Sequence, residues 1–289
     1  MRFSNLMSFE PSEVTETAKM TEVGYQRYKK KHISRLLTMN EVLKIRDQSL
    51  KHGGQIPKLK SSLTNKIIDK LHGLALARLI LHCHPSNQDY NLDDLRITYV
   101  TSSLGVIDIR LLFDIAYSFI PFFPYESRHL SVELMTKLKD IFYVVYPTEE
   151  YVENSSLGPE NANCIFLANS KYKSIKFKKQ VFSKFEIHPD NPSNGVVPHL
   201  KACIICNNKS GEITDDTILY LGSHNMTKAA WGRYAPDGQK LYISNYEMGV
   251  IFTPGPGTQA SKQRIVRNMG FVYPSSRYSQ SDKPFTRGA

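Results

Sequence analysis

The chain has few cysteines and no long apolar run, and each shortage excludes a class of protein. Four cysteines in 289 residues do not make a disulfide scaffold. The longest apolar segment, 111–124, is interrupted by Asp114 and Ser118 and is shorter than the roughly 20 residues that span a membrane. The first residues lack the continuous apolar stretch of a secretory signal. We expect a protein of the nucleus or the cytosol, with no membrane partner.

Acidic residues are also in short supply. The chain has 27 Asp and Glu against 37 Lys and Arg, which gives a formal net charge of +10 at pH 7. Such an excess favours a polyanionic partner, and we expect nucleic acid. On charge alone, a basic protein without a specific partner stays the alternative.

The sequence predicts no metal or cofactor site. Cys203 and Cys206 form a Cys-x-x-Cys pair, but its interior is apolar, no second pair follows, and the run is typical of a buried strand. His82 and His84 flank a cysteine at the end of an expected helix, just before Pro85, without carboxylate partners. No acidic cluster suited to a hard cation is present in the sequence.

Alternating strand and helix patterns predict an α/β fold, with a mixed sheet between layers of helices. We divide the chain into an irregular, basic N-terminal extension (1–60), a main folded unit (61–260) and a polar tail (261–289). The expected helices cover 63–83, 108–119 and 130–139, and the expected strands cover 92–101, 141–146, 202–206, 217–221 and 240–252.

The stretch from 198 to 252 holds the residues best suited to phosphate chemistry. His199 and Lys201 are two positions apart on a run with strand character, so their side chains should point to the same face. The imidazole can transfer a proton near neutral pH, and the ammonium can hold an anionic oxygen. Taken alone, a single histidine is more often an ordinary core histidine, which stays the alternative for His199.

Two further polar residues belong to this constellation. Asn225 lies between an expected strand and a short helix from Lys228, where it can cap the helix or turn its amide toward an anion. Glu247 lies in the expected strand 240–252, where a lone carboxylate needs a partner such as an imidazole. A His, a Lys, an Asn and a Glu on neighbouring strand ends can together handle a phosphate.

Three motifs in this order resemble a known family. They are His199-x-Lys201, the segment 223–232 (SHNMTKAAWG) and the segment 244–250 (SNYEMGV). The pattern is similar to the second active-site motif of the tyrosyl-DNA phosphodiesterases, a branch of the phospholipase D superfamily. The resemblance extends upstream to 141–148 and 101–105 and is faint before residue 95.

The resemblance implies a reaction and a role for each residue. The family hydrolyses the phosphodiester between a protein tyrosine and a DNA 3′ end without a metal or cofactor. One histidine forms a phosphohistidine, and a second protonates the departing tyrosyl oxygen and then activates water. His199 matches this second histidine, whereas Lys201 and Asn225 match groups that stabilise the phosphoryl oxygens. Glu247 matches the carboxylate that orients a catalytic imidazole, that of the other half.

The resemblance also implies contacts with DNA. Thr227 and Lys228 match DNA-backbone contacts, and the loop of Thr101, Ser102 and Ser103 matches one that holds the backbone. A plain helix-capping turn stays the alternative for that loop. Lysines interleaved with aromatic residues in 171–184 suit either a single-strand track or a helix with a wet basic face. The expected partners are single- or double-stranded DNA and DNA 3′ ends that carry tyrosine or peptide, in the nucleus.

The chain departs from the family in one respect. Complete members have two His-x-Lys motifs, one in each half, that meet across a pseudo-twofold axis. Here only His199 is followed by a lysine two positions later. We expect a C-terminal half, with the nucleophile-bearing half missing and the family's terminal Trp- and Pro-containing segment reduced or absent. The alternatives are a homodimeric phospholipase D-type nuclease and a non-catalytic protein that binds DNA ends.

Overall fold

A six-stranded mixed sheet lies at the centre of the computed structural model, which describes residues 33–34, 73–82, 90–120, 123, 130–234 and 241–288. Its order is β11-β8-β7-β2-β4-β6. The strands are β2 (Arg96–Val100), β4 (Phe142–Tyr146), β6 (Phe182–Lys184), β7 (Ala202–Cys206), β8 (Ile218–Gly222) and β11 (Gly249–Phe252). β2, β4 and β6 run parallel, whereas β7, β8 and β11 run antiparallel to their neighbours. The predicted fold class is confirmed.

The central strands arise from unbroken runs of β-branched, aromatic and small apolar residues. β2 (RITYV) and β7 (ACIIC) are buried along their whole length, as expected of strands that are covered on both faces. Cys203 and Cys206 are free thiols and are fully buried in β7. Their assignment to a buried strand is therefore confirmed.

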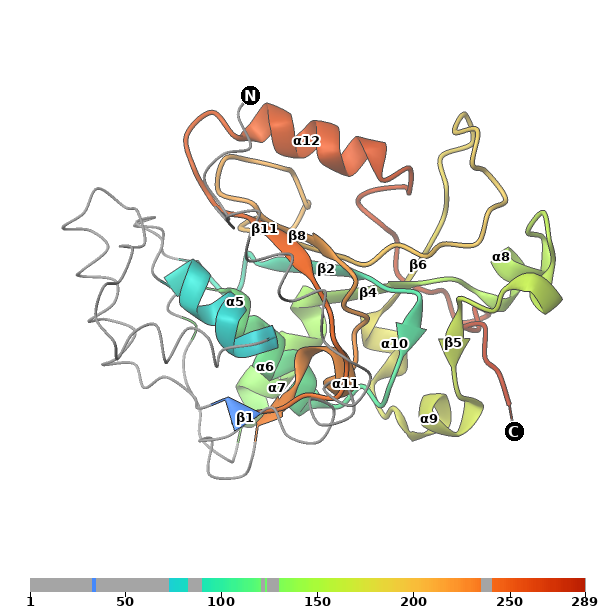
Figure 1. Cartoon of the computed structure of the whole chain (residues 1–289), viewed down its shortest axis with the longest axis horizontal. Helices are drawn as coiled ribbons and strands as arrows, with labels where there is room; N and C mark the ends of the chain where they lie inside the picture. Colours follow the sequence, from blue (N-terminus) through green and yellow to red (C-terminus); the bar gives the residue numbers. More distant parts are fainter. Residues whose placement is uncertain are drawn as a thin grey trace, which may run out of the picture.

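Helices cover both faces of this sheet (Figure 1). The helices α5 (Gly73–His82), α6 (Ile109–Phe119) and α7 (Val132–Ile141) lie on one side, and α12 (Gln259–Asn268) lies on the other. Side-chain caps start two of them: Asp108 accepts from the N–H of Leu111 at 2.9 Å, and Ser131 accepts from the N–H of Leu134 at 3.1 Å. Within the described ranges, the helices are all too short or too polar to cross a bilayer.

Most expected elements are found with small shifts at their ends. The helices expected at 108–119 and 130–139 are α6 and α7, and the strand expected at 217–221 is β8. Only the second half of the helix expected at 63–83 falls within the described residues, as α5. The expectation for 1–60 also lies outside them, apart from β1 (Ile33–Ser34).

Short elements fill the connections. β3 (Ser103–Leu104) pairs with β5 (Phe166–Leu167), and β10 (Leu241–Tyr242) lies between β1 and β9 (Arg233–Tyr234). The short helices are α8 (Glu149–Glu153), α9 (Asn169–Ser174), α10 (Lys178–Val181) and α11 (Lys228–Trp231), with a 3-10 turn, η1 (Pro159–Asn161).

The segment expected as a polar tail, 261–289, contains most of α12 and then runs back along the β6 edge of the sheet. Backbone bridges join Phe271 to Ile187 and Arg277 to Ser183. Phe271 is buried in the cluster under α12. The polar composition of this segment therefore coexists with regular packing, because a few apolar anchors and backbone hydrogen bonds suffice to hold it.

Candidate active site

Polar groups surround the side-chain oxygen of Asn225. The N–H of Ser103 donates to Oδ1 at 2.9 Å, and the hydroxyls of Ser102 and Thr101 each lie 3.1 Å from it. We call Asn225 and these three residues the Asn225 cradle. All of these contacts are made to Oδ1. The two Nδ2 protons have no hydrogen-bond partner in the part of the chain that the structure describes. They are available to an anion.

The sheet topology creates this cradle. β2 and β8 both run antiparallel to β7, so the C-terminal ends of β2 and β8 lie at the same end of the sheet. Thr101 follows β2 directly, and Asn225 lies three residues beyond β8. The N–H of Met226 donates to the hydroxyl of Thr101 at 3.1 Å, and a parallel bridge joins Met226 to Leu104. Residues more than 120 positions apart in the sequence thus form one loop cluster.

A buried aromatic cluster supports the cradle from below. The indole N–H of Trp231 donates to the hydroxyl of Tyr99 at 2.5 Å, and that hydroxyl lies 2.8 Å from the carbonyl of His224. The His224 ring stacks on Trp231 with centroids 4.1 Å apart, and its Nδ1 is hydrogen-bonded to the hydroxyl of Tyr220. Burial lowers the pKa of His224 to about 4, so this imidazole is neutral at physiological pH. It positions Asn225, its neighbour in sequence.

His199 and Lys201 lie in the extended segment that leads into β7. The strand begins only at Ala202, so the expected strand placement of the pair is wrong by a few residues. Lys201 is 5% exposed and donates to the backbone carbonyl of His199 at 3.0 Å, whereas the His199 side chain is exposed. Lys201 therefore folds inward instead of standing beside the imidazole as a second exposed group.

The pKa values of both side chains are shifted downward. Partial desolvation is the main cause for each, and the ammonium of Lys201 lowers the pKa of His199 further. A lowered pKa leaves His199 mostly neutral at pH 7. The imidazole is then ready to accept a proton, and it needs a nearby negative charge before it can serve as a strong proton donor.

Glu247 is not in a strand, so this expectation is wrong. The N–H groups of Ser244 and Asn245 donate to the carbonyl of Ala229 at 3.1 and 3.0 Å, which ties this segment to α11 and divides the expected strand into β10 and β11. Among the described residues, the carboxylate of Glu247 accepts a hydrogen bond from Nδ2 of Asn245 at 3.0 Å instead of one from an imidazole. Its charge opposes the lowering of the pKa of Lys201 and of His224.

Thr227 and Lys228 lie at the start of α11. The hydroxyl of Thr227 accepts from the N–H of Ala230 at 3.1 Å, so Thr227, and not Asn225, caps this helix. The ammonium of Lys228 forms an ion pair with the carboxylate of Asp108, the cap of α6. Both partners are partly exposed, at 33% and 41%, so a phosphate could compete for the lysine.

The lysine-rich segment 171–184 does not form an aromatic track for single strands. Phe182 is buried, and Tyr172 and Phe177 pack against the main core. The rings therefore face inward, which leaves a wet basic surface on α9, on α10 and between them. The exposed lysines of this surface are Lys171, Lys173, Lys176 and Lys179.

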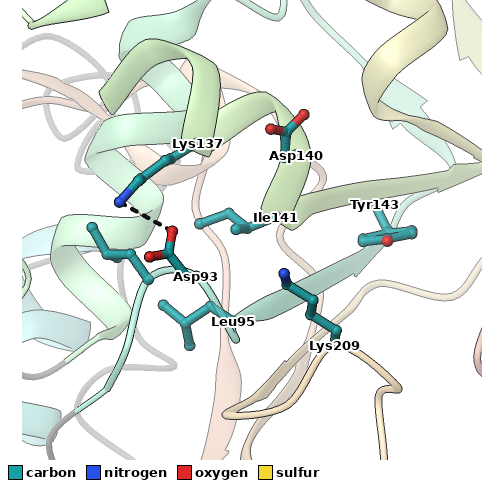
Figure 2. A pocket seen from close by; sticks show the side chains of 8 residues that line it. Asp93, Leu95, Lys137, Asp140, Ile141, Tyr143 and Lys209 are labelled. Atoms are coloured by element: carbon teal, nitrogen blue, oxygen red, sulfur yellow. Dashed lines mark ion pairs between the residues drawn. The ribbon is translucent and has the colours of Figure 1, made fainter. Parts of the chain in front are cut away.

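A pocket of about 290 Å³ lies at the opposite end of the sheet (Figure 2). It is lined by Leu92, Asp93, Leu95, Lys137, Asp140, Ile141, Tyr143 and Lys209, which surround the starts of β2 and β4. Lys137 is paired with Asp93 at 3.0 Å, so its charge is already balanced. The pocket is separate from the cradle and shares none of its residues. The described residues also contain no cluster of three His, Cys, Asp or Glu side chains that could hold a metal ion.

Sequence reasoning missed two groups at this site. Asp108 pairs with Lys228, and its only sequence signal was its position before an amphipathic helix. Tyr99, Tyr220 and Trp231 hold His224, and their only signal was the single tryptophan of the chain. The contacts of Tyr99 and of Asp108 join segments far apart in the sequence, whereas Tyr220 and Trp231 lie within seven residues of His224.

A mixed sheet between layers of helices, with the His-x-Lys segment and Asn225 at the same end of the sheet, is a phospholipase D-like arrangement. A mutant form of the yeast tyrosyl-DNA phosphodiesterase supports this class at the level of the fold. That structure matches 71% of this chain and 51% of its own length, with a TM-score of 0.51 and 18% identity. Another structure of the yeast protein matches 67% of this chain and 50% of its own, with a TM-score of 0.46 and 21% identity.

The family model described as tyrosyl-DNA phosphodiesterase matches residues 59–286. Tyrosyl-DNA phosphodiesterase 1 of Arabidopsis thaliana is 31% identical over 118 residues, which are 39% of this chain and 18% of the plant protein. The chain therefore belongs to the tyrosyl-DNA phosphodiesterase family, as the motifs predicted. It spans about half the length of the yeast structures and less of the plant relative.

Proposed function

We propose that the chain supplies one half of a phosphodiesterase site that releases tyrosine or peptide from DNA 3′ ends. The observation that carries this proposal is the Asn225 cradle, which saturates the amide oxygen and leaves the amide protons for a phosphoryl oxygen. Lys201 lies at the same end of the sheet as Asn225, because its carbonyl accepts a hydrogen bond from the N–H of Gly222, the last residue of β8, at 3.2 Å. Family membership supports the reaction class.

Each residue receives a role from its surroundings. Asn225 and Lys201 hold the non-bridging oxygens, and their donors stabilise the charge that builds up as the phosphorus is attacked. His199 is exposed at the mouth of the site, where it can protonate the departing tyrosyl oxygen and then take a proton from the attacking water. The phosphohistidine itself forms on a histidine of a second His-x-Lys motif. Thr227, Lys228 and the loop of Thr101 to Ser103 hold the DNA backbone.

A second half is needed for this chemistry, and an exposed apolar stripe supports its docking. Its residues are Tyr246 and Met248, which precede the edge strand β11, and Val250 within that strand, and they are 80%, 72% and 50% exposed. Glu247 lies between Tyr246 and Met248 in the sequence and has no imidazole partner among the described residues. A half that covers the stripe would bring its own imidazole to Glu247 and a carboxylate to His199. It could come from another stretch of the same protein or from another chain.

DNA binding by this half is proposed to be mainly electrostatic. The net charge is +10, and the lysines of α9, α10 and the segment between them are exposed. Affinity should therefore fall steeply as salt is added and depend little on base sequence. The same proposal places the protein in the nucleus, and microscopy of the tagged protein tests that location.

Reconstitution tests the proposal. The chain is mixed with the N-terminal half of a family member that bears its own His-x-Lys motif, and tyrosine release from a 3′-phosphotyrosyl oligonucleotide is followed. We expect turnover, and we expect His199→Ala to trap a covalent protein–DNA adduct, because resolution of the phosphohistidine requires His199. The control is His188→Ala, an exposed histidine of the 186–197 loop that pairs with Asp190. Rapid resolution by His199→Ala would contradict the role of His199.

Two other functions give different results in the same experiment. A non-catalytic DNA-end-binding protein is favoured by the complete cradle and the lowered pKa of His199, and it would bind DNA without turnover even with a second half present. A homodimeric nuclease would show twice the chain mass in solution and would cleave without any added half. Sedimentation and turnover together therefore distinguish the three.

A further inference from the structure

Two exposed apolar side chains flank the otherwise polar Asn225 cradle. Phe166 on β5 and Val106, between β3 and α6, are each 44% exposed. Phe166 is the one phenylalanine among the large hydrophobic side chains that are exposed in the described residues. Burial of aromatic area is strongly favourable, so an open ring beside a polar cluster indicates a contact that the described residues do not supply.

The backbone fixes Phe166 next to the cradle. β5 pairs in parallel with β3, and Phe166 is the direct partner of Ser103. The N–H of Phe166 donates to the carbonyl of Ser102 at 3.0 Å. Side chains of directly paired residues project from the same face of a sheet, so the Phe166 ring and the Ser103 hydroxyl stand side by side.

Val106 is a second exposed apolar residue, three positions after Ser103 of the cradle. The preceding residue, Gly105, packs on Thr227, because a Cβ at Gly105 would lie 3.6 Å from the Thr227 side chain. The loop that begins beside Phe166 thus leads past the cradle to the start of α11, where Lys228 lies.

We propose that Phe166 is a stacking platform for the flat ring carried beside the bound phosphate, with the nucleobase of the 3′-terminal nucleotide as its occupant. This inference rests on the proposed function and adds a subsite to it. A phosphate with an aromatic ring a few bonds away matches a polar cradle with an aromatic rim. Lys171 and Lys173 of α9 follow β5 in the sequence and are exposed, so the rest of the bound DNA strand can lie over positive charge. The ring of the departing tyrosine has the same chemistry and is the other source.

The test is binding of short 3′-phosphorylated oligonucleotides to the chain by fluorescence anisotropy. One oligonucleotide has a normal terminal base, a second has an abasic terminal residue, and a third joins phosphotyrosine to the abasic terminus. We expect Phe166→Ala to weaken binding of the first by roughly 5- to 100-fold and to leave the second unchanged. If only the third regains a Phe166-dependent affinity, the platform holds the tyrosyl ring, and the proposal stands with its second source.

Two more substitutions separate stacking from simple burial. Phe166→Trp should keep or improve the affinity for the first oligonucleotide. The affinity of Phe166→Leu should fall close to that of Phe166→Ala, because leucine keeps apolar area but has no ring. Leu157→Ala, at an exposed apolar residue after α8, is the matched control and should have no effect. Equal affinities of the wild type, Phe166→Leu and Phe166→Ala would contradict the stacking role of Phe166 while leaving the proposed function intact. Absence of any binding by the wild-type chain would overturn both.

Discussion

The Asn225 cradle and the pair of His199 and Glu247 lie at the same end of the sheet, yet they differ in completeness. In the cradle, three groups of the chain meet one amide oxygen, and a buried aromatic cluster holds them in place. His199 is exposed, and Glu247 contacts only an asparagine among the described residues. The difference agrees with the proposal that this chain supplies the groups that bind phosphate, whereas the groups that complete proton transfer come from a second half.

Removal of the Lys201 ammonium should have the largest effect. Lys201→Gln deletes the buried cation that we propose to hold the phosphoryl oxygens, and loss of one such donor lowers turnover by roughly 10²- to 10³-fold. The pKa of His199 should rise at the same time, because its cationic neighbour is gone. Turnover of the reconstituted enzyme and an NMR titration of His199 measure the two effects. Lys209→Gln, at the remote pocket, is the control, and equal losses in both variants would contradict the assignment.

Two substitutions of Asn225 separate the two ends of its amide. Asn225→Asp keeps the oxygen that Ser102 and Ser103 contact but removes the amide protons and adds a negative charge. DNA affinity should fall roughly 10- to 100-fold while the free energy of unfolding changes little. Asn225→Ala should in addition destabilise the fold by about 1–3 kcal/mol, because the N–H of Ser103 loses its acceptor. Anisotropy and urea unfolding give both quantities, and full DNA binding by Asn225→Asp would show that the amide protons are not used.

Acidification should loosen the support beneath the cradle. The pKa of His224 is lowered from 6.5 to about 4 in the folded state by burial, so above pH 6.5 the residue is neutral in both states and has no effect. As the pH falls from 6.5 toward 4, His224 binds a proton in the unfolded chain but stays neutral in the folded chain. Folding stability then falls by at most roughly 3 kcal/mol. Urea midpoints should drop over this window in the wild type and less in His224→Phe. Parallel curves would contradict the assignment.

The smallest expected effect comes from the ion pair of Lys228. Asp108→Asn keeps the cap of α6, because an asparagine oxygen can accept from Leu111, but it removes the charge that competes with DNA for Lys228. DNA affinity should rise by a few fold at low salt, and the gain should shrink as salt is added. Lower affinity in this variant would mean that Lys228 needs Asp108 to be held in place.

The sequence was informative where function is carried by a compact motif. The α/β class and the strand before Asn225 follow from strand runs and motif order, whereas the contacts of Asn225 with the loop of Thr101 to Ser103 were not predicted. Tertiary contacts decided the rest. The hydrogen bonds to Ala229 pull Glu247 out of its expected strand, although the apolar pattern around it is typical of one.

Local patterns also could not show which way side chains face. The aromatic residues of 171–184 alternate with lysines, and only the packing against the core shows that Tyr172 and Phe182 turn inward. The contacts between Tyr99 and Trp231 and between Asp108 and Lys228 span 132 and 120 positions. No spacing rule within one segment can anticipate such pairs.

A single-turnover assay of the chain alone tests the central claim most directly. The chain is present in excess over a 3′-phosphotyrosyl oligonucleotide, and DNA binding and tyrosine release are followed in the same sample, before and after addition of a half that bears a second His-x-Lys motif. We expect salt-sensitive binding from the start and tyrosine release only after the addition, because a lone general acid contributes only roughly 10²- to 10⁴-fold. Rapid release by the chain alone as a monomer would contradict it.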